Sequence, residues 1–290
     1  MTLTPAPDAA ARLPGPAPSA SPVPSVLPSL SVSPSPSVPP SLVLRVCCEF
    51  GLTAVLLLGV VTGVRWLFAP DGYGGGGGAA FALLGAGVGA LLAALMLSAP
   101  GRRSGAHLNP AVTLALWRLG AFPGRDVLPY CLAQLGGSVA GTWLGAVVWG
   151  PVVARPPVGY AAVRPGPGWG EGAVVVAEAG VLAASALMLA GLLARPVGRR
   201  LLPYAVGLVT ALVIALLGPL TGGSANPARQ FGPALLAWEA GGTGPLLWAY
   251  VAGPVLGAVA GAVLWRRLGG RQGGRQGARL GDRPVSPRET

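Results

Sequence analysis

The tripeptide Asn-Pro-Ala occurs twice in this chain. Its two asparagines are the residues whose side-chain type and spacing are best suited to a functional site. The two copies consist of Asn109, Pro110, Ala111 and Asn226, Pro227, Ala228. Asn is a favoured N-cap and Pro is favoured at the first helical position, so each copy predicts the start of a helix. An asparagine amide there can donate hydrogen bonds to a passing hydroxyl group or water molecule. The pattern indicates selection of a solute without reaction.

Each predicted helix is too short to cross a membrane. The apolar stretches at residues 112–117 and 231–238 last about two turns before Arg118 and Glu239, whereas a full span needs about 20 apolar residues. The end of a half-helix inside the membrane must contact protein or water, because unpaired backbone polar groups are costly in hydrocarbon. Two half-helices in corresponding halves of the chain indicate one central site, with the positive ends of both helix dipoles facing a shared lumen.

Six longer apolar stretches surround the two motifs and are expected to cross the membrane. They lie at about residues 44–68, 79–98, 127–149, 173–194, 203–220 and 246–265. Three spans and one half-helix thus occur twice, and because three is odd, the second repeat must run opposite to the first. We predict an all-α membrane protein with six transmembrane helices and two re-entrant half-helices in an inverted repeat.

Composition supports a membrane protein and argues against a nucleic-acid partner. Hydrophobic residues make up 52% of the chain and charged residues 10%, with a mean hydropathy of +0.62, which excludes an ordinary soluble domain. The net charge of +11 comes from arginines, most of which lie where the topology places cytoplasmic segments, as the positive-inside rule expects. A nucleic-acid site would instead group its basic residues on one folded face. We therefore expect a cell-membrane protein with both termini in the cytoplasm.

Composition also divides the chain into three parts. Residues 1–41 are rich in Pro, Ser and Ala, and residues 269–290 are rich in Gly and Arg. Both tails are predicted to be disordered. The domain at residues 42–268 would hold repeat one at about 44–150 and repeat two at about 173–267.

The paired motifs, with His107 before the first and Arg229 after the second, resemble those of the major intrinsic proteins, the aquaporin and aquaglyceroporin family. The resemblance covers about residues 43–267. It implies a channel in the lipid bilayer with no cofactor and no metal, assembled as a homotetramer. It also implies that Glu49, in the first span, accepts hydrogen bonds from a motif-bearing loop, and that Glu178 is its counterpart in the fourth span. We expect His107 to pack against a half-helix in the inner vestibule.

The family resemblance also assigns an outer selectivity filter by spacing. Gly89 lies twenty residues before Asn109, while Ile214 and Gly223 lie twelve and three residues before Asn226. Arg229 would add a fixed positive charge and several donors. Two glycines remove side-chain volume and Ile214 offers no hydrogen-bonding group, so the filter should be wider and more apolar than a water-selective one. It is most similar to the filter of the plant nodulin-like intrinsic proteins, which pass boric acid and other metalloid hydroxides.

Several functions remain open at this point. The leading interpretation is a passive channel for small uncharged solutes, namely boric acid, arsenite, glycerol or urea, with water. A water-selective aquaporin is the first alternative. A secondary transporter also uses inverted repeats, but it needs intramembrane charges for its coupling ion, and both Glu49 and Glu178 have candidate structural roles. No enzyme is expected, because His107 has no suitably spaced nucleophile or second histidine.

Overall fold

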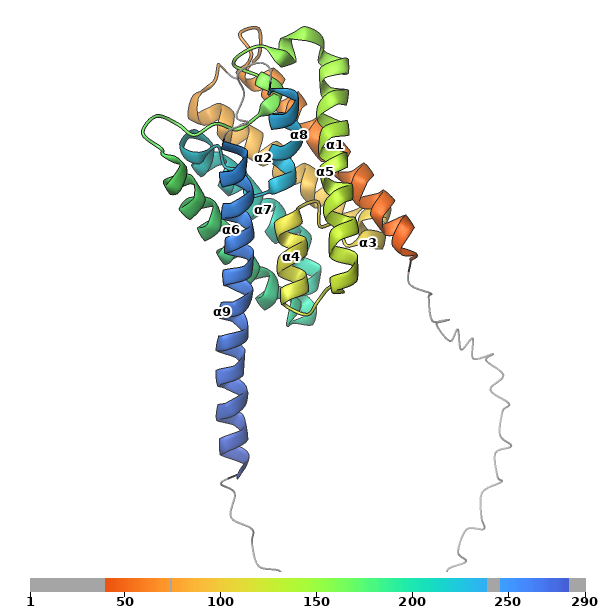
Figure 1. The fold of residues 1–290 in the computed structure, drawn as a ribbon, viewed down its shortest axis with the longest axis vertical. Helices are drawn as coiled ribbons and strands as arrows, with labels where there is room; N and C mark the ends of the chain where they lie inside the picture. Colours follow the sequence, from red (N-terminus) through yellow and green to blue (C-terminus); the bar gives the residue numbers. More distant parts are fainter. Residues whose placement is uncertain (1–39, 74, 239–245, 282–290) are drawn as a thin grey trace, which may run out of the picture. The chain divides into compact units, whose positions relative to one another are not determined.

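The computed structural model describes residues 40–73, 75–238 and 246–281, with side chains described as far as Gly269, and its regular structure there is helical (Figure 1). The helices long and apolar enough to cross a membrane are α1 (Leu42–Phe68), α2 (Gly77–Leu97), α5 (Val127–Trp149), α6 (Glu171–Leu193), α7 (Pro196–Thr221) and α9 (Leu247–Gly281). The predicted all-α membrane fold with six spans is confirmed.

Two short helices are the predicted half-helices. They are α4 (Pro110–Arg118) and α8 (Pro227–Leu236), and each starts directly after an asparagine whose side-chain oxygen accepts hydrogen bonds from the first turn. Both helix starts can therefore be predicted from the sequence alone, because Asn caps the backbone and Pro fits the first helical position. The remaining short elements are α3 (Ala99–Ser104) and the 3₁₀ helices η1 (Gly124–Asp126), η2 (Gly150–Ala154) and η3 (Gly159–Ala161).

The contacts between helices follow a pseudo-twofold pattern. Helix α1 packs along α5, α6 packs along α9, and α2 packs along α7. Each half-helix packs mainly against the last span of the other repeat, α4 against α9 and α8 against α5. Because each contact in one repeat has its counterpart in the other, the packing has the symmetry of an inverted repeat.

Small residues allow the paired spans to approach closely. A Cβ atom added to Gly141 of α5 would lie 2.1 Å from the carbonyl oxygen of Ala54 in α1. The symmetry-related contact is also tight, because a Cβ atom on Gly261 of α9 would lie 2.5 Å from the carbonyl oxygen of Ala183 in α6. Membrane helices cannot rely on the hydrophobic effect to associate, so such close backbone approach is how they gain packing energy.

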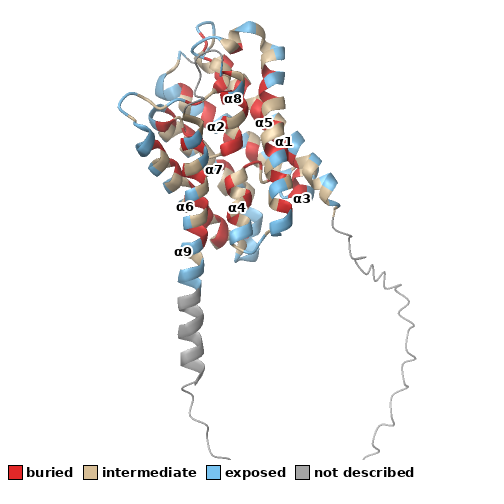
Figure 2. Ribbon diagram, in the orientation of Figure 1, coloured by how far each residue is buried: buried red, intermediate tan, exposed pale blue. Residues whose placement is uncertain are grey.

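The outward faces of the spans are apolar and exposed (Figure 2). On α7 the side chains Tyr204, Leu208, Leu212 and Leu216 recur every fourth residue and are 48 to 66% exposed. Residues four apart share one side of a helix. A continuous apolar stripe of this kind fits contact with lipid or with another membrane helix, not with water.

Two spans have different ends from those expected. Helix α7 begins at Pro196 and not at about residue 203, because Pro203 lies inside the helix without ending it, as neighbouring groups allow in membrane helices. Helix α9 continues to Gly281, through part of the tail for which we predict disorder. The apolar stretch ends at Trp265, but no proline follows before residue 281 to interrupt the helix. Residues 1–39 and 282–290, the rest of the predicted tails, lie outside the described residues.

Candidate pore and selectivity filter

A cavity of about 420 Å³ runs between the helices of both repeats. Its lining includes Phe68 and Phe81, at the ends of α1 and α2 that face one side of the membrane, and Met96 and Leu193, at the opposite ends of α2 and α6. The stretch of α2 between Phe81 and Met96 is about 22 Å long at the usual helical rise. The cavity therefore extends across most of the hydrocarbon thickness.

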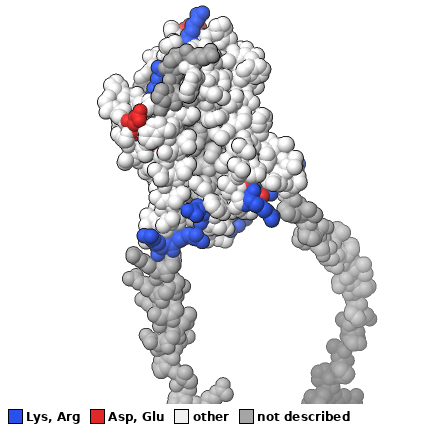
Figure 3. Space-filling view, in the orientation of Figure 1, with Lys and Arg blue, Asp and Glu red and all other residues white. Residues whose placement is uncertain are grey.

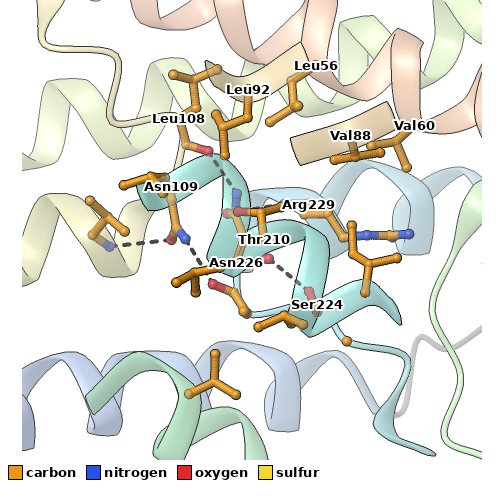
Figure 4. A pocket seen from close by; sticks show the side chains of 18 of the residues that line it. Leu56, Val60, Val88, Leu92, Leu108, Asn109, Thr210, Ser224, Asn226 and Arg229 are labelled. Carbon is orange, nitrogen blue, oxygen red and sulfur yellow. Dashed lines mark hydrogen bonds between the residues drawn. The ribbon is translucent and has the colours of Figure 1, made fainter. Parts of the chain in front are cut away.

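The two asparagines meet in this cavity (Figure 4). The side-chain nitrogen of Asn109 donates to the carbonyl oxygen of Ala225, and that of Asn226 donates to the carbonyl oxygen of Leu108, each over 2.9 Å. Both asparagines line the cavity. An amide nitrogen carries two hydrogens, so each side chain keeps one N–H that can donate to a solute. The remaining motif residues begin the half-helices and do not line the cavity.

The backbone before each asparagine has an unusual conformation. Leu108 and Ala225 have φ values of +49° and +47°, which place both in the left-handed region. Residues with a side chain rarely adopt this region, and each instance costs about 1–3 kcal/mol. The surrounding structure must therefore hold these segments in place.

Two buried carboxylates provide that support. Glu49 accepts hydrogen bonds of 3.0 and 2.9 Å from the two backbone N–H groups that precede Asn109. Glu178 accepts hydrogen bonds of 3.2 and 2.5 Å from the two that precede Asn226. The glutamates are 0% and 1% exposed. Hydrogen bonds from backbone donors to an ionised acceptor are stronger than those between neutral groups, so both loops are tied to a span of their own repeat.

Sequence reasoning missed a stripe of polar residues on α5 that also supports the loops. Gln134 donates to Glu49 over 2.8 Å, and the hydroxyl of Tyr130 donates to the carbonyl oxygen of Ser104 over 2.7 Å. The hydroxyl of Ser138 donates to the carbonyl oxygen of Ala228 and accepts from the backbone of α8. Tyr130, Gln134 and Ser138 are spaced by four residues in an apolar span, and that spacing is the signal that could have identified them.

His107 lies beside the first half-helix. Its Nδ1 atom is 3.1 Å from the hydroxyl of Thr113 on α4, and its ring packs against Phe122 and Tyr130 with centroid distances of 4.7 and 5.1 Å. His107 also contributes to the cavity lining. Its packing within an aromatic group fixes the ring, so it presents a constant surface to the lumen.

Three of the four expected filter residues line the cavity, namely Ile214, Gly223 and Arg229. Arg229 donates to the carbonyl oxygen of Ala161 over 2.7 Å. The next residue, Gln230, exchanges hydrogen bonds of 2.9 and 3.1 Å with the backbone of Val163. These contacts attach the segment at residues 157–164 to α8. Residues of that segment also line the cavity. The segment therefore forms part of the cavity's outer end.

The fourth expected filter residue, Gly89, does not line the cavity. It lies on the side of α2 that faces α7, where an added Cβ atom would be 2.4 Å from the carbonyl oxygen of Gly207. Counting residues fixes the height of a position on a helix, but one residue corresponds to a rotation of about 100°. The neighbouring residue, Val88, lines the cavity instead. In Figure 4, Val60 and Val88 lie farther along the same side of the cavity than Leu56 and Leu92.

The chain matches known proteins in sequence. Residues 39–265 match the family model described as Major intrinsic protein. The chain is 41% identical over 150 residues to the probable aquaporin AqpM of Archaeoglobus fulgidus, a match that covers 50% of this chain and 59% of the relative. It is 36% identical over 160 residues to the propanediol uptake facilitator PduF of Citrobacter freundii, covering 48% and 58% respectively. These matches thus span less than two thirds of either relative.

A solved structure shows the same fold. The aquaglyceroporin from Plasmodium falciparum superposes with a TM-score of 0.66 at 22% identity, covering 78% of this chain and 96% of that one. The predicted aquaporin-like fold is therefore confirmed. Because the family model matches most of the chain, from the first span to the last, this protein belongs to the major intrinsic protein family.

Proposed function

We propose that this protein is a passive channel for small uncharged solutes, including glycerol, urea, boric acid and arsenite, together with water. The observation that carries the proposal is the cavity that extends across the spans and passes both asparagines. Among its described lining residues the charged side chains are Arg164 and Arg229, and none is acidic. A fixed arginine and the positive ends of two half-helices oppose the passage of cations and protons.

The lining supports a solute class broader than water. We propose that Val88, Ile214, Gly223 and Arg229 form the outer filter, with Val88 in the place expected for Gly89. Arg229 supplies donors, while Val88 and Ile214 supply an apolar wall without hydrogen-bonding groups. A filter of this chemistry favours solutes that combine hydroxyl or amide groups with a small apolar body. The names of the two relatives, an aquaporin and a propanediol facilitator, are consistent with this range.

A coupled transporter is less well supported. The buried acids Glu49 and Glu178 accept backbone hydrogen bonds and do not contribute to the cavity lining. Neither carboxylate is therefore placed to bind a coupling ion beside a solute. A flux that depends linearly on the solute gradient, with no effect of an ion gradient, is the expected behaviour.

We further propose a multi-pass cell-membrane protein with cytoplasmic termini, assembled as a homotetramer. Arginines gather at one end of the described helices (Figure 3), and those at the ends of spans include Arg102, Arg103, Arg199, Arg266 and Arg267. This end corresponds to the cytoplasmic side by the positive-inside rule. The homotetramer is inferred from the family, and native mass spectrometry in detergent would test it.

Replacing Val88 with tryptophan tests whether the cavity is the conducting path. Val88 lines it, so the larger side chain should lower glycerol, urea and boric acid flux by about tenfold or more by occupying the lumen. The measurement is stopped-flow light scattering of proteoliposomes. Gly87→Trp is the matched control, because Gly87 is exposed and an added Cβ atom there would meet nothing within 4 Å.

The control should conduct like the unchanged protein. If the unchanged protein passes no solute faster than protein-free liposomes, the channel function is wrong. If it conducts but Val88→Trp conducts equally well, the path lies elsewhere. Water flux alone, without solute flux, would support the water-selective alternative.

A further inference from the structure

The C-terminal end of the first half-helix carries a small basic surface outside the pore. Helix α4 contacts both α5 and α9, and its last two residues are Trp117 and Arg118. A short turn then leads through Gly124 and Arg125 into α5. Trp117 is 40% exposed, and both arginines are exposed as well. We call Trp117, Arg118 and Arg125 the α4 corner.

The turn places the two arginines close to the indole ring. The guanidinium carbon of Arg118 lies 5.3 Å from the ring centroid of Trp117, which fits a cation–π contact. A Cβ atom at Gly124 would lie 2.6 Å from the indole nitrogen. Because Gly124 has no side chain, the ring can pack against the residue that directly precedes Arg125. The three residues of the α4 corner therefore lie around a single turn.

The described part of the chain supplies no free acidic group to the α4 corner. Arg118 forms no ion pair there. Asp126 lies 3.7 Å from Arg125, but it is 3% exposed and pairs with Arg45 over 2.8 Å. The other described acids are buried or lie at the opposite ends of the spans. The indole N–H of Trp117 likewise has no acceptor among the described residues. The corner thus offers more donors than the protein itself uses.

The α4 corner lies at the level where the helices change from apolar to basic. The apolar stretch of α5 begins at Val127, and that of α9 ends at Trp265, directly before two arginines. Figure 3 shows that arginines gather at this end of the spans. Leu128 and Leu132 of α5, one turn apart, are 65 and 59% exposed. A molecule bound at the corner would meet arginines at one end and leucines beyond them.

We propose that the α4 corner binds the phosphate group of an anionic phospholipid, whose acyl chains lie along α5. Arg118 and Arg125 donate to the phosphate oxygens through their planar guanidinium groups, and the indole N–H of Trp117 supplies a further donor. A zwitterionic lipid also carries a cationic group, which would face the arginines. Basic surfaces between helices at this level suit anionic headgroups. The inference does not depend on which solutes the channel passes.

A bound lipid would have a structural effect on the pore. Helix α4 begins at Asn109, one of the two asparagines in the cavity, and ends at the α4 corner. The lipid phosphate would join Arg118, at the end of this half-helix, to Arg125, at the start of α5. The outer end of the half-helix would then be held by lipid as well as by protein.

The test is native mass spectrometry of the purified protein in a non-ionic detergent, titrated with dioleoyl-phosphatidylglycerol or dioleoyl-phosphatidylcholine. The first phosphatidylglycerol should bind about tenfold more tightly than the first phosphatidylcholine. Arg118→Gln should lower the affinity for phosphatidylglycerol about tenfold, the effect of one hydrogen bond between charged groups. Trp117→Phe keeps an aromatic ring and removes the N–H group, so it should lower this affinity about fivefold.

Arg103→Gln is the matched control, because it removes the same charge at the same end of the spans. Arg103 is exposed and lies on α3, which packs against α1 and α2. A loss of affinity in Arg118→Gln but not in Arg103→Gln supports the site. Equal losses in both variants would show diffuse attraction to the basic end and overturn it. Equal binding of the two lipids, or binding of glycerol phosphate as tight as that of the lipid, would also overturn it.

Discussion

Replacing Gly89 with alanine should destabilise the protein by about 2 kcal/mol, the usual effect of overpacking a closed contact. The added Cβ atom would lie 2.4 Å from the carbonyl oxygen of Gly207 and 3.0 Å from the Cβ atom of Ala211. The first of these is backbone, so it cannot rotate away, and α2 and α7 must separate. Thermal unfolding of the detergent-solubilised protein, followed by size-exclusion chromatography, should show a lower Tm.

Gly87→Ala provides the control on the same helix. An alanine there would meet nothing within 4 Å, and alanine is favoured over glycine in a helix by up to about 1 kcal/mol. The control should be as stable as the unchanged protein or slightly more so. If Gly89→Ala were equally stable and instead narrowed the range of solutes, Gly89 would belong to the filter, as the family spacing suggests, and not to the helix contact.

Replacing Glu178 with glutamine should destabilise the protein by about 3 kcal/mol and abolish selective flux. The carboxylate accepts a hydroxyl hydrogen bond from Thr221 over 3.1 Å and backbone hydrogen bonds from Ser224 and Ala225 over 3.2 and 2.5 Å. A glutamine keeps one oxygen but turns the other acceptor into an N–H₂ group. At least one N–H group before Asn226 then faces another donor. Tm and solute flux should fall together.

Glu171→Gln is the matched substitution on the same helix. Glu171 is exposed and accepts a hydrogen bond from the indole of Trp248 over 3.2 Å, which a glutamine oxygen can also accept. Its Tm and flux should match those of the unchanged protein. Unchanged stability in Glu178→Gln would show that the carboxylate charge contributes nothing to holding the loop.

The sequence predicts those parts of the pore that depend on local chemistry. Asn109 and Asn226 cap the half-helices because an N-cap followed by proline is a local signal, readable from neighbouring residues. The number of spans follows from hydropathy. Their orientation follows from counting, because three spans, an odd number, leave the chain on the opposite side of the membrane and so invert the second repeat. The places of Glu49 and Glu178 follow from the family resemblance, and a buried acid in a span needs a partner wherever it occurs.

Other parts depend on how helices are rotated against each other, which residue counting does not give. Gly89 and Val88 are neighbours in the sequence, yet one lies in the contact with α7 and the other lines the cavity. Ser138 supports α8 although some ninety residues separate them. The attachment of Val163 to Gln230 likewise joins a loop to a half-helix distant in sequence. Such contacts are set by tertiary packing, and single-sequence patterns carry no record of them.

The crossed packing of the half-helices has a consequence for how the protein is made. Helix α4 packs mainly against α9, whose first residue, Leu247, is synthesised well over a hundred residues after Arg118, the last residue of α4. A chain emerging from the ribosome inserts its first three spans before the wall that covers α4 exists. The hydrogen bond from Asn109 to Ala225 likewise cannot form until the loop before α8 has been made. The wall around the first half-helix is therefore complete only when the last span has entered the bilayer.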